Sequence, residues 1–351
     1  MTDYIALGIM SGTSLDGLDL ALCRFWQESD KTKNWDFEIL SAITVAYPKD
    51  LTAQLRNAQN GSALELITLH KHYGKFIAQK VNDFLVGKPR PLFIASHGHT
   101  IFHYPEQGIN FQLGDGAVVA ALTGLAVVCD FRSQDIALAG QGAPLVPVGD
   151  IYLFGEYDLL LNLGGFSNIT VRSEMIAFDI SPVNYALNFF ARQLGLEFDR
   201  DGQLGKQGKV NNRLLAALDS IDYYSLKPPK SLSDHWFYKK FLPIIQAYQI
   251  NAIDKLATLY HHISAQIAAV LNHYQGRTLV TGGGAKNKFL IELIQRQVNN
   301  EIIIPPMELV DYKEAVVFAF LGLLRWLGIE NVYASFTGAV RNTISGSVYL
   351  P

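Results

Sequence analysis

The chain has 351 residues, of which 49% are hydrophobic and 17% are charged. Average soluble proteins carry about 25% charged residues, so this composition excludes a disordered chain and favours large buried cores. The 29 Lys and Arg residues nearly balance the 32 Asp and Glu residues, which argues against a nucleic-acid binder because no basic field attracts a polyanion. The length indicates about two domains.

The N-terminal half predicts strands first and then helices that alternate with short buried strands. In chain order the pattern predicts strands at 4–10, 18–25 and 37–45, helices at 51–57 and 63–86, a strand at 91–96, a helix at 115–122 and a strand at 125–129. The segment 130–150 is rich in Gly and Pro, and we interpret it as a functional connection.

Regular structure then restarts in a similar order. The pattern predicts strands at 158–163, 168–172 and 175–178, a helix with Ser181 as N-cap and Pro182 at its first position, helices at 211–218, 238–247 and 253–274, a strand at 278–281, a helix at 287–298, a strand at 301–304 and a helix at 312–327. Because the two halves look alike, we expect two α/β domains of related topology with a ligand cleft between them.

Three loops combine glycines with Ser, Thr or Asn. Two of them, 11–17 and 164–168, connect strands, and the third, 281–287, lies between a strand and a helix. Glycine lets backbone N–H groups approach an anion, and a helix N-terminus favours phosphate. One such loop is typical of an ordinary turn, but three together favour nucleotide binding, without the GxxxxGK[ST] pattern of a Walker loop.

Two carboxylates stand at the ends of predicted elements. Asp179 follows a strand and precedes a helix, where it is either a general base facing a cleft or a capping acid. Glu314 lies three residues after Asp311 at the predicted start of the last helix, which matches a capping box.

Two basic side chains follow buried strands. His97 lies in Ser96-His97-Gly98-His99-Thr100, and it either donates a hydrogen bond to a polar ligand or is structural, because no carboxylate or cysteine cluster supports a metal site. Arg132 either forms a bidentate pair with a ligand carboxylate or phosphate, or pairs with Asp130 or Asp135.

We expect a cytoplasmic protein. No stretch approaches the ~20 apolar residues that span a bilayer, and residues 1–10 lack the basic residues of a signal peptide. The two cysteines, Cys23 and Cys129, provide no disulfide framework.

Several motifs in order along the chain resemble the anhydro-N-acetylmuramic acid kinase family. They are Gly8-Ile9-Met10-Ser11-Gly12-Thr13-Ser14-Leu15-Asp16-Gly17-Leu18-Asp19, Ser96-His97-Gly98, Asp130-Phe131-Arg132, Gly140–Pro147, Asn162–Asn168, Pro228–Ser231, Thr281–Asn287 and Glu314-Ala315. The family usually reads DTGPxN where this chain has Asp179-Ile180-Ser181-Pro182-Val183-Asn184, and it usually continues PPKS with Gly, a basic residue and Glu, where this chain has Ser233-Asp234-His235.

The resemblance implies two RNase H-like domains of the actin and hexokinase type with ATP in the cleft. We expect the first domain to comprise residues 1–130 with 335–351 and the second 131–334. The resemblance also implies ATP and Mg²⁺ as cofactors, no nucleic-acid or membrane partner, and a homodimer. The implied cofactor-binding residues are Gly12, Thr13, Ser14, Leu15, Asp16, Gly17, Leu18, Asp19, Gly164 and Gly165 at the phosphates, and Gly282, Gly283, Gly284 and Asn287 at the nucleoside.

The implied reaction converts 1,6-anhydro-N-acetylmuramic acid and ATP to N-acetylmuramic acid 6-phosphate and ADP, in cell-wall recycling. Asp179 would be the base, and Glu314 is a further implied catalytic residue that meets the sugar together with His97 and Arg132. The alternatives are a kinase of the same fold for another amino or anhydro sugar, and a catalytically weak nucleotide- or sugar-binding sensor.

Overall fold

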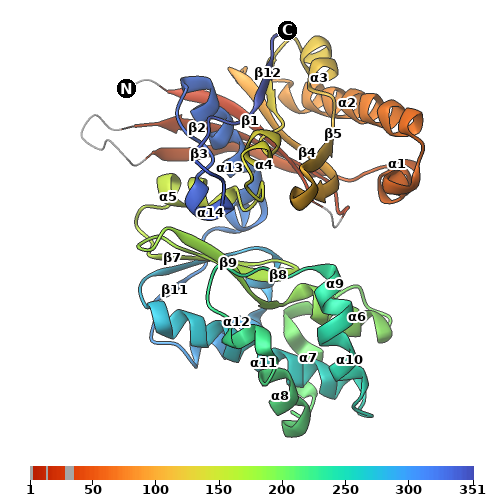
Figure 1. Ribbon diagram of the computed structural model, residues 1–351, viewed down its shortest axis with the longest axis vertical. Helices are drawn as coiled ribbons and strands as arrows, with labels where there is room; N and C mark the ends of the chain where they lie inside the picture. The colour runs from red at the N-terminus through yellow and green to blue at the C-terminus, as the bar shows by residue number, and fades with distance from the viewer. Residues whose placement is uncertain (1–2, 13–14, 28–34) are drawn as a thin grey trace. The chain divides into compact units, whose positions relative to one another are not determined.

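The computed structural model of the chain describes residues 3–12, 15–27 and 35–351. Two compact units can be followed by colour along the chain in Figure 1: unit 1 comprises Met1–Gly155 with Tyr312–Pro351, and unit 2 comprises Glu156–Asp311. The sequence predicted boundaries after residues 130 and 334, whereas the structure divides the chain after Gly155 and after Asp311. The segment 130–150 and the last long helix pack with the N-terminal strands and therefore belong to unit 1.

Unit 1 is built on one sheet in the order β12-β6-β4-β1-β2-β3, with β5 paired to β4. Strands β1, β2 and β3 are antiparallel neighbours, whereas β4 and β6 run parallel to β1. The strands are β1 (Tyr4–Ser11), β2 (Leu18–Trp26), β3 (Asp36–Val45), β4 (Phe93–Tyr104), β5 (Ile109–Leu113), β6 (Ala126–Cys129) and β12 (Ser347–Tyr349).

Helices cover both faces of this sheet, as β1 makes clear. Leu7 and Ile9 share a buried cluster with Tyr73 of α2, whereas Gly8 between them contacts Ala315 of α13, because side chains alternate along a strand. The helices of unit 1 are α1 (Lys49–Asn57), α2 (Ala63–Leu85), α3 (Gly116–Thr123), α4 (Ser133–Ala137), α5 (Val146–Leu153), α13 (Met307–Leu327) and α14 (Ala334–Thr337).

The last long helix starts earlier than the sequence pattern predicts. α13 begins at Met307, so Asp311 and Glu314 lie inside the helix and the capping-box interpretation is wrong. The missed signal is Pro305-Pro306, since proline is favoured at and before the start of a helix.

Unit 2 repeats the topology of unit 1. Its sheet has the order β11-β10-β7-β8-β9, with β7, β8 and β9 antiparallel and β10 and β11 parallel to β7. The strands are β7 (Leu159–Leu163), β8 (Phe166–Val171), β9 (Ile176–Pro182), β10 (Thr278–Thr281) and β11 (Ile302–Ile303). The duplicated α/β fold expected from the sequence is confirmed.

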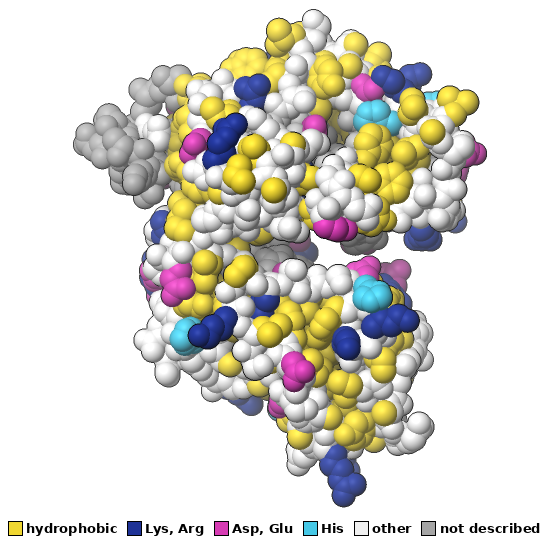
Figure 2. Space-filling view, viewed as in Figure 1, with side chains coloured by type: hydrophobic (Ala, Val, Ile, Leu, Met, Phe, Trp, Pro, Cys, Tyr) yellow, Lys and Arg dark blue, Asp and Glu magenta, His cyan; other side chains and the backbone are white. Residues whose placement is uncertain are grey.

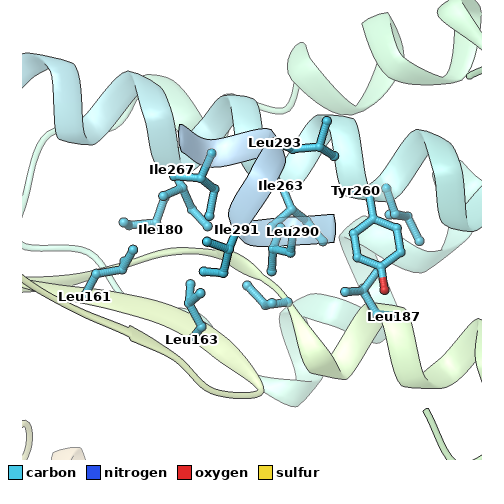
Figure 3. Packing of buried hydrophobic residues seen from close by; sticks show 14 of the residues in the cluster. Leu161, Leu163, Ile180, Leu187, Tyr260, Ile263, Ile267, Leu290, Ile291 and Leu293 are labelled. Carbon is cyan, nitrogen blue, oxygen red and sulfur yellow. The ribbon is translucent and has the colours of Figure 1, made fainter. Parts of the chain in front are cut away.

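The helices of unit 2 bury one face of this sheet. Figure 3 shows Leu161, Leu163 and Ile180 of the strands packed against side chains of α11 and α12, and all three are at most 2% exposed. The helices are α6 (Asn184–Gln193), α7 (Gln203–Gln207), α8 (Asn212–Asp219), α9 (Asp234–Trp236), α10 (Leu242–Gln246), α11 (Ala252–Tyr274) and α12 (Lys288–Gln295).

The predicted helix start at Ser181-Pro182 is wrong. β9 continues to Pro182, because the backbone N–H of Ser181 donates to the Ser167 hydroxyl of β8 (3.1 Å). α6 begins at Asn184, and the carbonyl groups of Gly164 and Gly165 accept the N–H groups of residues 183–185 in place of a side-chain cap. The glycine turn after β7 is therefore joined to the start of α6.

The surface shows no single charged field on the face seen in Figure 2, where Lys and Arg side chains are scattered among neutral ones. Within the described residues, no helix is both long and apolar enough to cross a membrane.

Candidate active site

The first glycine loop connects β1 to β2 in unit 1. Leu15 has a left-handed φ of 60°, and its N–H donates to the Gly12 carbonyl (3.3 Å). Gly17 is buried against β3, where a Cβ would lie 2.7 Å from the Thr44 side chain. The same threonine donates its hydroxyl to Asp19 (2.6 Å). Thr13 and Ser14, expected at the phosphates, lie outside the described residues.

The entrance to this loop is fixed by a buried chain of hydroxyl groups. The Ser11 hydroxyl lies 2.9 Å from Nδ1 of His99 and 2.7 Å from the Tyr47 hydroxyl, which contacts the Tyr73 hydroxyl at 2.8 Å. Burial lowers the pKa of His99 to about 4, so its ring is neutral at neutral pH. These contacts hold Ser11, the last residue of β1, to β4 and to Tyr47 after β3, and through Tyr47 to α2.

His97 and Arg132 form a pair where the pairing of β4 with β6 ends: His97 lies within β4, just after Ser96 pairs with Cys129, and Arg132 follows β6. Arg132 donates to Nε2 of His97 from Nε (3.2 Å) and from Nη2 (2.8 Å), and to the Gly142 carbonyl (2.5 Å). Because a guanidinium only donates, Nε2 of His97 is the acceptor, and its Nδ1–H donates to the Gly98 carbonyl (2.8 Å). Burial, followed by the charge of Arg132, lowers the pKa of His97 well below its usual value.

Arg132 also connects His97 to the acidic groups of unit 1. Burial lowers the pKa of the guanidinium to about 10, while Glu314 and Asp135 raise it. Glu314, which is exposed on α13, interacts electrostatically with Arg132 and with Asp19 of β2. Three predicted site residues, Arg132, Glu314 and Asp19, are thus brought together in unit 1 from distant parts of the chain.

A polar cavity of about 190 Å³ adjoins this group. His97, Asp130 and Ser133 line it together with Asn110 and Gln112 of β5. Its lining is rich in amide and hydroxyl groups, which suit a ligand with neutral polar substituents.

The other two glycine loops meet in unit 2. Gly282 has a φ of 81°, and a Cβ there would lie 2.3 Å from Oδ1 of Asn162 at the end of β7. A Cβ on Gly284 would lie 2.7 Å from the Leu163 side chain. The loop 282–284 therefore packs on the carboxyl end of β7, directly beside the Gly164-Gly165 turn, and only glycines permit this close approach.

Asn287, predicted at the nucleoside, has a structural use in this fold. Its oxygen caps α12 by accepting the Leu290 N–H (3.1 Å), and its amide donates to the Tyr260 hydroxyl (2.8 Å). Its contact with a nucleoside stays a prediction.

Asp179 lies on β9 at a β-bulge, where the register shifts between Ser167 and Asn168 of the partner strand. Bulges re-aim side chains and are common beside active sites. Burial raises the pKa of Asp179 to about 6, while the Leu232 N–H, which donates to Oδ2 (2.8 Å), lowers it. A half-buried carboxyl that titrates near neutrality is suited to general base catalysis.

Sequence reasoning missed the segment that surrounds Asp179. The Tyr223 hydroxyl donates to the Asp179 carbonyl (2.7 Å), and the Asp179 N–H donates to the Lys230 carbonyl (3.1 Å). The family motif Pro228–Ser231 was the available signal. Spacing along the sequence does not show that this motif lies next to Asp179.

No cluster of three or more His, Cys, Asp or Glu side chains that could hold a metal ion occurs in the part of the chain that the structure describes.

Two α/β units of related topology, with glycine loops at the ends of strands, fit the sugar-kinase class that the sequence motifs predict. The model of the family described as "Anhydro-N-acetylmuramic acid kinase" matches residues 4–351, and the chain belongs to this family. Its relatives include proteins named anhydro-N-acetylmuramic acid kinase from Sulfurovum sp., 34% identical over 98% of both chains, and from Shewanella amazonensis, 35% identical over 99% of both. A protein of the same name from Bacillus cereus is 30% identical over 99% of both chains. The chain is therefore an enzyme of a kinase family that uses a nucleotide.

Proposed function

We propose that this enzyme opens the 1,6-anhydro ring of 1,6-anhydro-N-acetylmuramic acid with water and transfers the γ-phosphoryl group of ATP to O6. The products are N-acetylmuramic acid 6-phosphate and ADP. The observation that carries the proposal is the Asp179 carboxyl, whose raised pKa and bulged strand suit a base, in a chain that matches the kinase family over residues 4–351.

The substrate has no free 6-hydroxyl group that a base could deprotonate. The base must therefore activate a water molecule. Asp179 would take a proton from water while the water oxygen forms a bond to the anomeric carbon. The bond between that carbon and the bridging oxygen breaks, and the released O6 forms a bond to the γ-phosphorus as ADP leaves. Capture by phosphorus replaces the general acid that a glycosidase needs.

The glycine loops are the proposed ATP site. Backbone N–H groups of the loop that starts at Gly12 and of Gly164-Gly165 would meet the phosphates, and the loop 282–284 would meet the nucleoside. Mg²⁺ neutralises phosphate charge in such reactions and takes one or two carboxylates besides the phosphates. Two carboxylates of unit 1 would be candidates to hold it: Asp19, in β2 after the first glycine loop, and Glu314, whose pKa is raised by the charge of Asp19.

The sugar is proposed to meet His97, Arg132 and Glu314. Arg132 is a fixed cation that suits the carboxylate of a muramic acid, since a guanidinium binds carboxylates in a bidentate manner. The polar cavity beside His97 supports a ligand with neutral polar substituents. A cytoplasmic location, a homodimer and a role in cell-wall recycling stay predictions. The names of the relatives do not favour the alternative of a same-fold kinase for another sugar.

The substitution Asp179→Asn tests the proposal. It keeps the shape of the side chain and removes the base, so we expect turnover to fall by about 100- to 10,000-fold. ATP binding, followed by calorimetry, should be nearly unchanged. Glu197→Gln, at an exposed acid of the same unit and outside the segment that surrounds Asp179, is the matched control and should retain full turnover. Normal turnover by Asp179→Asn would refute the role of this carboxyl.

A further inference from the structure

A buried hydrogen-bonded network lies behind the segment that holds Asp179. His262 of α11 is fully buried, and its Nδ1 lies 2.6 Å from Oδ1 of Asp219 at the end of α8. Its Nε2 lies 2.8 Å from the hydroxyl of Tyr224. We call Asp219, His262 and Tyr224 the His262 network.

The protonation of this network follows from its geometry. Burial lowers the pKa of His262, so its ring carries one proton at neutral pH, although Asp219 opposes the shift. A carboxylate only accepts, so the proton is on Nδ1, and Nε2 accepts the Tyr224 hydroxyl. Tyr224 is thus held by a histidine whose orientation is fixed by Asp219. The Gln266 amide also donates to this carboxylate (3.0 Å).

The network reaches Asp179 through the segment 222–232. Tyr224 lies in this segment next to Tyr223, which donates its hydroxyl to the Asp179 carbonyl. The ammonium of Lys230 donates to the Tyr223 carbonyl (3.1 Å), and the Leu232 N–H donates to the Asp179 carboxylate (2.8 Å). The segment therefore holds both the backbone and the carboxylate of Asp179.

A second contact joins the network to β9 itself. The Tyr224 hydroxyl lies 3.4 Å from the hydroxyl of Ser181, which is fully buried two residues after Asp179.

We propose that the His262 network is a positioning network: Tyr224, fixed by His262 and Asp219, holds the segment 222–232 in the register that fixes the carboxylate of Asp179. None of the three residues touches the reacting atoms. The inference rests on the proposed role of Asp179 as the base.

The substitution Tyr224→Phe in the full chain tests the proposal, because it removes one hydroxyl and keeps the ring. We expect kcat to fall by about 10- to 100-fold, as for a small misplacement of a catalytic group, with the KM for ATP unchanged. The acidic limb of the kcat profile should also move to higher pH. The Leu232 N–H stabilises ionised Asp179, and a loosened segment weakens that hydrogen bond. The other titratable groups of the segment, Asp222, Tyr223, Lys227 and Lys230, remain in place.

His261→Asn is the matched control, since His261 precedes His262 on the same helix and lies outside the network; it should keep the kcat and the acidic limb of the wild type. Asp219→Asn should lower kcat and move the acidic limb to higher pH, both by less than Tyr224→Phe. If Tyr224→Phe does not fold, the result for Asp219→Asn tests the positioning role. Variants that lose only melting temperature, with unchanged kcat and acidic limb, would overturn the proposal.

The proposed function can fail separately from this inference. A wild-type chain without turnover would contradict the function. The network is then tested by following the Asp179 carboxyl by NMR, where Tyr224→Phe should still raise its pKa. An unchanged pKa in that experiment would overturn the network's role.

Discussion

Asp179 owes its suitability as a base to two opposed influences on one carboxyl. Burial raises its pKa to about 6, and the Leu232 N–H limits the rise. The sequence predicted Asp179 from its place at the end of a strand, but not its environment, because Leu232 and Tyr223 come from a distant segment. Arg132 and His97 were likewise predicted singly, and their mutual hydrogen bonds follow only from the parallel pairing of β4 with β6.

The pH dependence of turnover follows from this pKa. As the proposed base, Asp179 would act in its ionised form, which is present above a pH of about 6 and is lost below it. We therefore expect kcat/KM to fall about tenfold for each pH unit below pH 6. Above about pH 7 the ionisation of Asp179 should no longer change kcat/KM. A profile that stays level down to pH 4.5 would contradict Asp179 as the ionising base.

The same pKa predicts a stability effect of opposite sign to the activity effect. The pKa of this carboxyl is higher in the folded chain than in the unfolded chain. Ionisation therefore favours the unfolded chain, and the free energy of unfolding falls as the pH rises through the unfolded and then the folded pKa. Asp179→Asn should therefore raise the melting temperature at pH 8, and should raise it less at pH 5, where the wild-type carboxyl is protonated. A lower melting temperature at both values would mean that the substitution damages the fold, and its lost turnover would then say nothing about a base.

At the scale of elements, the contact of α13 with β1 brings Glu314 to the first glycine loop. A Cβ on Gly8 would lie 1.9 Å from the Ala315 carbonyl, so strand and helix touch through a glycine. Beside Glu314, buried Lys313 pairs with buried Asp150 of α5 (2.6 Å), which anchors the same turn of the helix. Periodicity predicted both elements. Periodicity could not predict which residues touch. It shows which face of an element is apolar, whereas a close contact at a glycine and a buried ion pair depend on how two elements pack.

Gly8→Ala tests this contact. The added methyl group must push α13 away from β1, and such overpacking costs about 1–3 kcal/mol of the free energy of unfolding. Chemical denaturation should show this loss, together with a higher KM for the sugar as Glu314 shifts. Gly61→Ala is the matched control: it adds a methyl group that meets no atom closer than 3.5 Å, so the free energy of unfolding should barely change. Equal free energies of unfolding for the two variants would contradict the tight contact between β1 and α13.

At the scale of the whole molecule, the strand order β11-β10-β7-β8-β9 of unit 2 repeats the order β6-β4-β1-β2-β3 of unit 1, and each unit holds its own set of predicted site residues. Unit 1 brings together Arg132, Glu314 and Asp19, and unit 2 brings together Asp179 and two glycine loops. The sequence predicted the duplication, because both halves begin with a strand, a glycine loop and two further strands. The unit boundaries escaped prediction, because α13 joins the first sheet only through contacts distant in sequence.

The central claim is that water, activated by Asp179, attacks the anomeric carbon while O6 receives the phosphoryl group. The most direct test is to incubate the purified chain with Mg-ATP and 1,6-anhydro-N-acetylmuramic acid in oxygen-18 water, and to locate the label by mass spectrometry. We expect ADP and a 6-phosphosugar with oxygen-18 at the anomeric hydroxyl and none in the phosphoryl group. Label in inorganic phosphate, with the sugar unchanged, would mean plain ATP hydrolysis and would contradict the claim.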